Sequence, residues 1–270
     1  MKRIVVVLCA VLMATPAFAG VVYEIETTDH LSSPARVFDA EMVVEGQSLK
    51  MGVEAGEGGT NNDMIFRGDR REMIVVDHDD RTYFVMDEAT LKELAAKLND
   101  VTAMMEQAMA NVPESQRAMV EKMMKQRMPQ QAAPRVASEL RKTGDRDTIN
   151  GYPCVRYELW RGGLRTSELW VTDWSNIEGG PETTEAFQEM SEFFKEMLDS
   201  IPQFAGGGEV ADTAFEHMKE MNGFPVVTRE FADDGLLERM VRLKSATRRT
   251  IDPAAFEPPK GYKRKDMFKN

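Results

Sequence analysis

Residues 148–160, Thr-Ile-Asn-Gly-Tyr-Pro-Cys-Val-Arg-Tyr-Glu-Leu-Trp, hold the strongest fold signal in this chain of 270 residues. Asn150-Gly151 favours a two-residue β-hairpin, because both central positions of that turn need a positive φ. We therefore expect a strand that starts near Ala137, runs to Lys142 or as far as Ile149, and pairs with a strand over Tyr152–Trp160. The fold is thus expected to be built from antiparallel neighbours.

Strand patterns continue outward from this hairpin in both directions. Val21–Thr28 alternates apolar and polar residues, which is typical of a half-buried strand. Turn residues separate the other expected strands, which lie at 36–44, 48–53, 72–76, 82–86, 165–172, 226–231 and 236–243. Consecutive hairpins of this kind predict an antiparallel meander.

Two helical insertions interrupt the expected strands, at about 88–128 and 181–221. The first breaks near Pro113, and the second carries an apolar stripe at helical spacing that includes Phe187, Met190 and Phe194. We predict a single α+β domain over 20–262, in which a curved antiparallel sheet, an incomplete β-barrel, is covered by helices. Phe256 and Tyr262 of the proline-rich tail are expected to dock on the sheet, and residues 263–270 to form a basic, solvated end.

The first nineteen residues have the form of a signal peptide. Lys2 and Arg3 precede an apolar run of ten residues, and Ala17-Phe18-Ala19 offers the small-x-small pattern that a signal peptidase cleaves. Ten apolar residues cannot cross a bilayer, which needs about 20. We expect an exported, periplasmic protein that does not span the membrane.

Charge and cysteine content exclude several classes of function. The net charge of −11 argues against nucleic acid as a partner, since phosphates demand a basic face. Only Cys154 remains after the expected cleavage, so no intramolecular disulfide can form. Three states of Cys154 stay open: a quiet thiol in a strand, a disulfide-linked dimer, and a nucleophile, for which nothing nearby supplies a base.

Motifs for catalysis or metal binding are missing from the sequence. It holds no HExxH, GxSxG, P-loop, CxxC or GxGxxG pattern. The three histidines, His30, His78 and His217, are far apart in the chain, and Asp77–Asp80 lacks the spacing of a calcium loop, so a solvated turn explains it better. We therefore expect a non-enzymatic protein with no cofactor and no metal.

Eleven of the twenty methionines lie on the two insertions, and they allow three interpretations. The first is that they are ordinary core residues of amphipathic helices. The second is that they cover an adaptable apolar cavity, because the unbranched, polarisable side chain repacks around different ligands. The third is that their thioethers bind Cu(I). The candidate apolar lid comprises Met105, Met109, Met119, Met123, Met124, Phe187, Met190 and Phe194.

Three short motifs support a family resemblance: Asn150-Gly151-Tyr152-Pro153, Asp234-Gly235, and Phe256-Glu257-Pro258-Pro259-Lys260-Gly261-Tyr262. With the exported start, they resemble an uncharacterised exported bacterial family, domain of unknown function 4412, which is similar to the periplasmic lipoprotein-carrier (Lol-type) superfamily. The resemblance implies an incomplete barrel closed by helices, with acyl chains between sheet and helical lid. The two long insertions depart from the carriers, and no carrier residue maps onto a position here.

These observations lead to one expected function and two alternatives. The first is binding of an apolar ligand, a lipid or an acylated protein, between sheet and helical lid. The second is an envelope structural or protein-interaction module with no small ligand. The third and weakest is copper binding by methionine.

Overall fold

A twelve-stranded sheet forms the body of the protein in the computed structural model, which describes residues 19–53, 61–110, 138–200, 217 and 219–266. The expected signal peptide and most of the second part of each insertion lie outside the described residues. The strands are β1 (Ala19–Asp29), β2 (Arg36–Glu45), β3 (Ser48–Val53), β4 (Asn62–Arg67), β5 (Glu72–Asp77), β6 (Thr82–Met86), β7 (Ser138–Ile149), β8 (Tyr152–Arg161), β9 (Leu164–Asp173), β10 (Gly223–Phe231), β11 (Leu237–Thr250) and β12 (Lys263–Arg264). The helices are α1 (Glu88–Ala110) and α3 (Gly180–Ser200), with short 3₁₀ turns η1 (Trp174–Asn176) and η2 (Pro253–Phe256).

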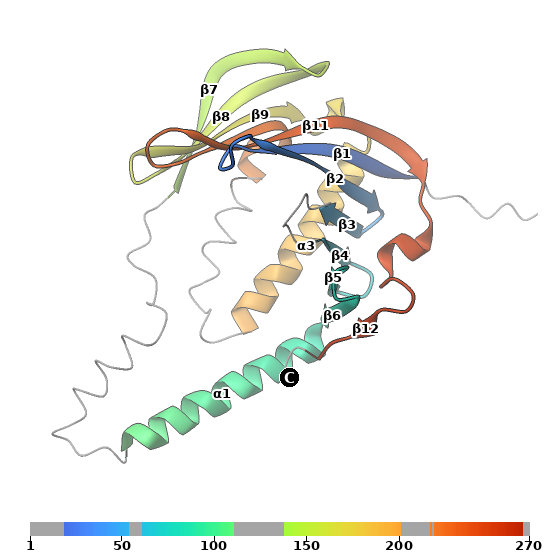
Figure 1. The fold of residues 1–270 in the computed structure, drawn as a ribbon, viewed down its shortest axis with the longest axis vertical. Coiled ribbons are helices and arrows are strands. Elements are labelled where there is room, and N and C mark those ends of the chain that lie inside the picture. The colour runs from blue at the N-terminus through green and yellow to red at the C-terminus, as the bar shows by residue number, and fades with distance from the viewer. Residues whose placement is uncertain (1–18, 54–60, 111–137, 201–216, 218, 267–270) are drawn as a thin grey trace, which may run out of the picture.

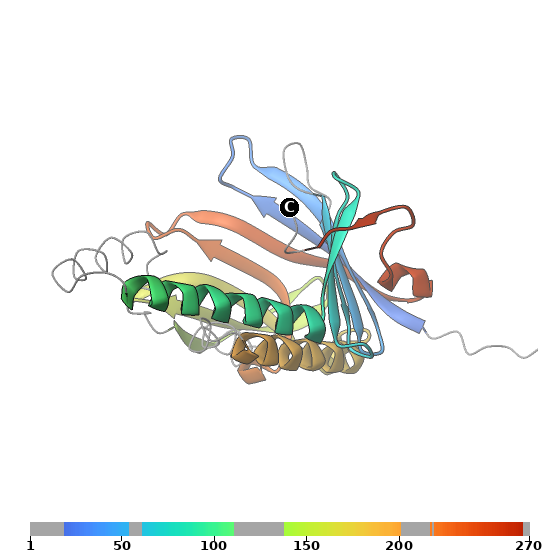
Figure 2. The ribbon, with the colours of Figure 1, turned by 90° about the horizontal axis from the view of Figure 1, so that it is seen from below.

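The sheet is curved and open, as predicted, with the order β12-β6-β5-β4-β3-β2-β1-β11-β10-β9-β8-β7 (Figure 1). Every neighbouring pair is antiparallel except β12 and β6, so the expected all-antiparallel sheet is corrected at one edge. Helices α1 and α3 lie side by side on one side of the sheet (Figure 2). The fold is dominated by strands, and the helices cover only part of it.

The predicted turn between β7 and β8 is confirmed by its backbone. Asn150 has a φ of 51° and Gly151 a φ of 85°, the two positive values that the tight hairpin requires. The Asn150 side chain also donates a hydrogen bond to the carbonyl of Leu243, with a distance of 2.7 Å. This turn is therefore tied to β11 as well as closing its own hairpin.

Alternation along β1 divides the core into two faces. Val21 and Tyr23 belong to a cluster that faces the helices, which supply Leu91 from α1 and Phe193 from α3. Val22 points the other way, into a second cluster with Phe256 of η2, the outer cluster. The expectation that the tail docks on the sheet is confirmed for Phe256 and for Tyr262, which packs against the same cluster.

The first turn of α3 is fastened to the sheet by a buried hydrogen-bond group. The Tyr23 hydroxyl donates to the carbonyl of Glu178 at 2.9 Å and lies 2.6 Å from the Thr183 hydroxyl. Gly180 allows the close approach, since a Cβ there would lie 2.0 Å from the Trp174 carbonyl oxygen. The first turn of α3 is therefore held close to β1. Farther along the helix, Phe187 lines a cavity between α3 and the sheet.

Candidate functional site

An apolar cavity of about 310 Å³ lies between the inner face of the sheet and α3. Its lining residues come from the strands, from η1, from α3 and from the turn before β10. They are Ile25, Met42, Met51, Leu169, Trp174, Phe187, Met221, Gly223, Phe224, Pro225, Thr228, Val241 and Leu243. No Asp, Glu, His, Cys, Lys, Arg or Tyr is among these described residues, so they supply no titratable acid or base. It can hold an apolar group and exclude water from it.

Strand periodicity aims the sheet residues into the cavity. Ile25 lies directly opposite Leu243 across the β1–β11 pair, and Met42 lies opposite Met51 across the β2–β3 pair. Paired residues of neighbouring strands share a face, so the four side chains form a continuous apolar floor. Phe187 of α3 is the helical wall.

Aromatic rings form one end of the cavity. Phe224 stacks on Tyr23 with ring centroids 5.2 Å apart, and Trp174 meets Phe224 edge to face at 5.7 Å. Such pairs add stability beyond the area that they bury. This end of the cavity is therefore rigid.

A smaller, polar hollow of about 220 Å³ adjoins the apolar cavity; we call it the annex. Trp174 and Phe187 line both spaces. The remaining annex residues are polar: Thr184, Gln188, Ser191, Lys219 and Asn222. An apolar space and a space with mostly polar lining residues therefore lie next to each other.

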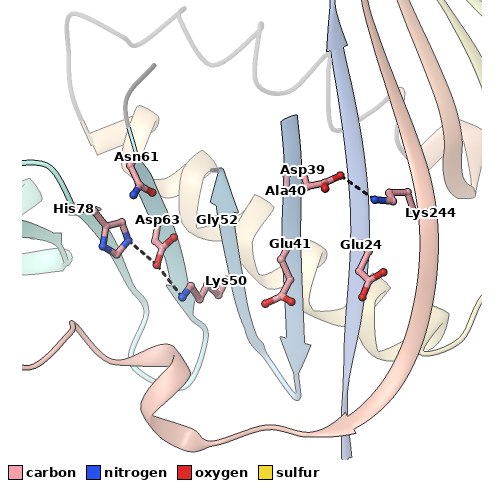
Figure 3. A pocket seen from close by; sticks show the side chains of 10 residues that line it. All are labelled: Glu24, Asp39, Ala40, Glu41, Lys50, Gly52, Asn61, Asp63, His78 and Lys244. Carbon is pink, nitrogen blue, oxygen red and sulfur yellow. Dashed lines mark hydrogen bonds and ion pairs between the residues drawn. The ribbon is translucent and has the colours of Figure 1, made fainter. Parts of the chain in front are cut away.

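A polar hollow of about 740 Å³ lies on the opposite, outer face of the sheet (Figure 3). The buried Asp63 carboxylate lies between two basic side chains. Lys50 Nζ lies 2.8 Å and His78 Nε2 3.1 Å from Asp63 Oδ2. Nearby, Lys244 Nζ donates to Asp39 at 3.0 Å, an ion pair that raises the pKa of Lys244.

His78 has no nitrogen left for a substrate. Nε2 lies 3.1 Å from the Asp63 carboxylate. Nδ1 lies 2.9 Å from the Tyr262 hydroxyl, with which it shares a hydrogen bond. The imidazole thus connects the tail to the sheet, and the outer hollow is better explained as a solvated ion-pair surface than as a ligand site, which usually has mostly apolar walls.

The structure places the predicted lid residues unevenly. Phe187 lines the cavity, Met190 is buried in the core between α3 and the sheet, and Phe194 is partly buried against that core. The backbones of Met105 and Met109 lie in α1, but their side chains are outside the described residues. Met119, Met123 and Met124 are outside them altogether, so the lid and the copper alternative stay predictions.

The sheet residues of the cavity are not among the predicted lid residues, all of which lie on the two helical insertions. Met42 and Met51 lie on predicted strands, and the alternation of Val21, Tyr23 and Ile25 already marked one face as apolar. The same alternation, extended from the first strand to the two strands beside it, would have placed Met42 and Met51 on the apolar face that forms the floor of the cavity. Trp174 and Phe224 gave no such signal, since they lie at the ends of elements.

Cys154 is a buried free thiol. Burial raises the pKa of this thiol, and its sulfur donates to the carbonyl of Tyr152 at 3.3 Å. Both effects disfavour the reactive thiolate. The expectation of a quiet thiol in a strand is confirmed.

Two searches of the described residues gave negative results. Among residues 19–53, 61–110, 138–200, 217 and 219–266, no three His, Cys, Asp or Glu side chains are grouped so as to hold a metal ion. No helix within that part of the chain is both long and apolar enough to cross a membrane.

Comparisons with known proteins give one family and several distant structures. A family model described as a domain of unknown function, DUF4412, matches residues 99–262, more than half of the chain. A search of curated proteins found no match.

Similar solved structures have low sequence identity to this chain. An uncharacterised conserved protein from Thermus thermophilus is 6% identical with a TM-score of 0.40, over 90% of this chain and 88% of that one. PNGF-II is 9% identical with a TM-score of 0.40, over 92% of this chain and 31% of that one. A LolA superfamily protein from Nitrosomonas europaea is 9% identical with a TM-score of 0.26, over 90% of this chain and 91% of that one.

Proposed function

We propose that this chain, which belongs to the DUF4412 family, is a non-enzymatic periplasmic protein that binds an apolar ligand between its curved sheet and α3. The ligand is a lipid or the acyl chain of an acylated protein. The observation that carries the proposal is the apolar cavity of about 310 Å³. Its walls are hydrophobic and aromatic, as in most small-molecule sites, and its volume is within their usual range.

The cavity volume limits the size of the group that it can hold. A methylene is about as large as a water molecule, whose share of liquid volume is roughly 30 Å³, so about ten methylenes fit. Burying ten of them contributes about 8 kcal/mol in total. Loss of ligand freedom offsets part of this, so the dissociation constant is expected to be no tighter than about 1 μM. Such affinity suits a protein that must also release its ligand.

The side chains around both hollows support a binding role over catalysis. The cavity has no titratable lining, and His78 on the outer face has both nitrogens engaged by Asp63 and Tyr262. The buried Cys154 thiol has a raised pKa, which opposes a nucleophilic role. The periplasmic location is supported by the signal-peptide pattern of residues 1–19.

Native mass spectrometry of the full chain expressed with its signal sequence tests the proposal directly. We expect a bound lipid at near-unit stoichiometry, which organic extraction then identifies. The delipidated protein is titrated with 1-decanol by calorimetry, since a neutral ten-carbon chain probes the apolar cavity alone.

Two variants of one strand separate the cavity from the rest of the surface. Leu169→Trp adds bulk inside the cavity, whereas Leu164→Trp adds the same bulk on β9 at a side chain that is 46% exposed. We expect Leu169→Trp to weaken decanol binding at least about ten-fold, equivalent to 1.4 kcal/mol, and Leu164→Trp to leave it unchanged. An apo mass together with no decanol uptake would refute the proposal, as would equal losses in the two variants.

A specific observation favours the envelope interaction module as the second candidate. Leu31, Val37 and Leu236 are each more than 60% exposed and lie at the same end of the sheet, where the His30 amide donates to the Glu238 carbonyl. Exposed apolar clusters often mark protein contacts. This candidate predicts concentration-dependent association in sedimentation velocity, lost in a Leu31→Ser/Leu236→Ser variant, and a protein that stays free of lipid.

A further inference from the structure

The annex adjoins the apolar cavity and supplies polar side chains beside it. Trp174 and Phe187 line both spaces, and in the chain the cavity residues Met221 and Gly223 flank the annex residue Asn222. A molecule with its chain in the cavity can therefore place its polar end in the annex. A ligand that occupies both spaces is therefore an amphiphile, with an apolar chain and a polar head group.

The charge of the annex is positive in an acidic protein. Among the described residues that line it, Lys219 is the one with a charge, although the chain as a whole carries a net charge of −11. Within the described part of the chain, the Lys219 ammonium has no hydrogen-bond or ion-pair partner. An exposed cation without such a partner is available to a negatively charged head group.

Uncharged donors accompany this cation. The Gln188 amide and the Ser191 hydroxyl lie on α3 one turn apart and both line the annex. The Thr184 hydroxyl donates to the carbonyl of Gly180 at 2.9 Å, so toward a ligand it can only accept. Gln188, Ser191 and Lys219 can each donate a hydrogen bond to an anionic oxygen in the annex. A cationic head group would be repelled by the Lys219 ammonium.

We propose that the ligand is a single-chain amphiphile with an anionic head group, a carboxylate or a phosphate, whose head group pairs with Lys219 in the annex. This inference rests on the proposed function, since it assumes that the chain occupies the cavity. It adds the charge of the head group, its position, and a chain limit of about ten methylenes inside the protein.

Calorimetry with three ten-carbon ligands tests the inference: decanoate, decyl phosphate and the neutral 1-decanol. Lys219→Met removes the charge and keeps an unbranched apolar stem. Lys195→Met is the matched control, because Lys195 is an exposed residue of α3 that does not line the annex. Lys219→Arg keeps the charge.

We expect Lys219→Met to weaken binding of at least one anionic ligand about five-fold, as for an exposed ion pair of about 1 kcal/mol. Binding of 1-decanol should stay unchanged in every variant. Lys219→Arg and Lys195→Met should bind the anions like the original protein. The anion with the larger loss identifies the head group as carboxylate or phosphate.

The outcomes separate this inference from the proposed function. If 1-decanol binds and Lys219→Met leaves both anions unaffected, the inference is overturned and the apolar cavity stands as a binding site. If Lys195→Met weakens the anions as much as Lys219→Met, the effect is one of overall charge, and the inference is again overturned. If none of the three ligands binds, both proposals fail.

Discussion

Tyr23→Phe is expected to destabilise the protein through the hydrogen bonds that fasten α3 to the sheet. The phenol has one proton, which it donates to the Glu178 carbonyl, so the Thr183 hydroxyl must donate to the phenol oxygen. Tyr23 and Thr183 are both 0% exposed. Phenylalanine leaves the buried Thr183 hydroxyl and the Glu178 carbonyl without this partner, which costs about 1–3 kcal/mol.

The same residue predicts a pH dependence. Burial raises the pKa of Tyr23 from its ordinary value of 10.0 to about 12. The unfolded chain then loses the phenol proton at lower pH than the folded one. Stability from this group is complete below pH 10 and declines as the pH rises toward 12, by about 1.4 kcal/mol for each pH unit and about 3 kcal/mol in total.

Urea unfolding followed by far-UV circular dichroism measures both effects. We expect the free energy of unfolding to fall by about 2 kcal/mol in Tyr23→Phe at pH 7, and the fall between pH 10 and 12 to shrink in the variant. Tyr83→Phe is the control, because Tyr83 packs against the outer cluster on the other face. A loss in Tyr23→Phe no larger than in Tyr83→Phe, or an unchanged alkaline slope, would refute the reasoning.

Three further predictions concern stability. Gly180→Ala should lower the free energy of unfolding by about 1–3 kcal/mol, because the new Cβ would overlap the Trp174 carbonyl; an unchanged thermal midpoint would contradict this. Glu168→Gln removes a buried charge that Arg229, and two other arginines more weakly, contact. Since these arginines are partly exposed, we expect the free energy of unfolding to fall by about 2 kcal/mol, less than for a fully buried pair. A chemical denaturation curve equal to that of the original protein would contradict this expectation. Tyr262→Phe should cost about 1 kcal/mol by removing the hydrogen bond to His78, seen as faster amide exchange where β12 meets β6; unchanged exchange there would show that the tail is held by packing alone.

Local signals in the sequence predict most of the sheet. The Asn150-Gly151 turn and the alternation of Val21–Thr28 are properties of a few neighbouring residues, and both are present in the structure. Strand β4 was missed because Met64-Ile65-Phe66 is a continuous apolar run. Its two faces are covered, by the helix-facing core and by the outer cluster, and a strand buried on both sides does not alternate.

The candidate site was predicted less completely than the fold. Phe187 was found because its helix has apolar residues at regular spacing, which is again a local signal. The cavity itself depends on the register of strands distant in sequence, such as Ile25 opposite Leu243, and no short pattern specifies that register. The annex depends on Lys219 and α3 meeting in space, which the sequence alone does not reveal.

The central position of β1 has a consequence for how the chain acquires its structure. Strands β1 to β6 pair with their neighbours in sequence, and so do β7 to β11. The two meanders meet where β1 pairs with β11, with Val21 opposite Arg248. Closing such a distant pair is slow compared with forming a local hairpin. Each meander can therefore form its hairpins while the chain is being synthesised. The β1–β11 pairing, which completes the cavity, requires nearly the whole chain.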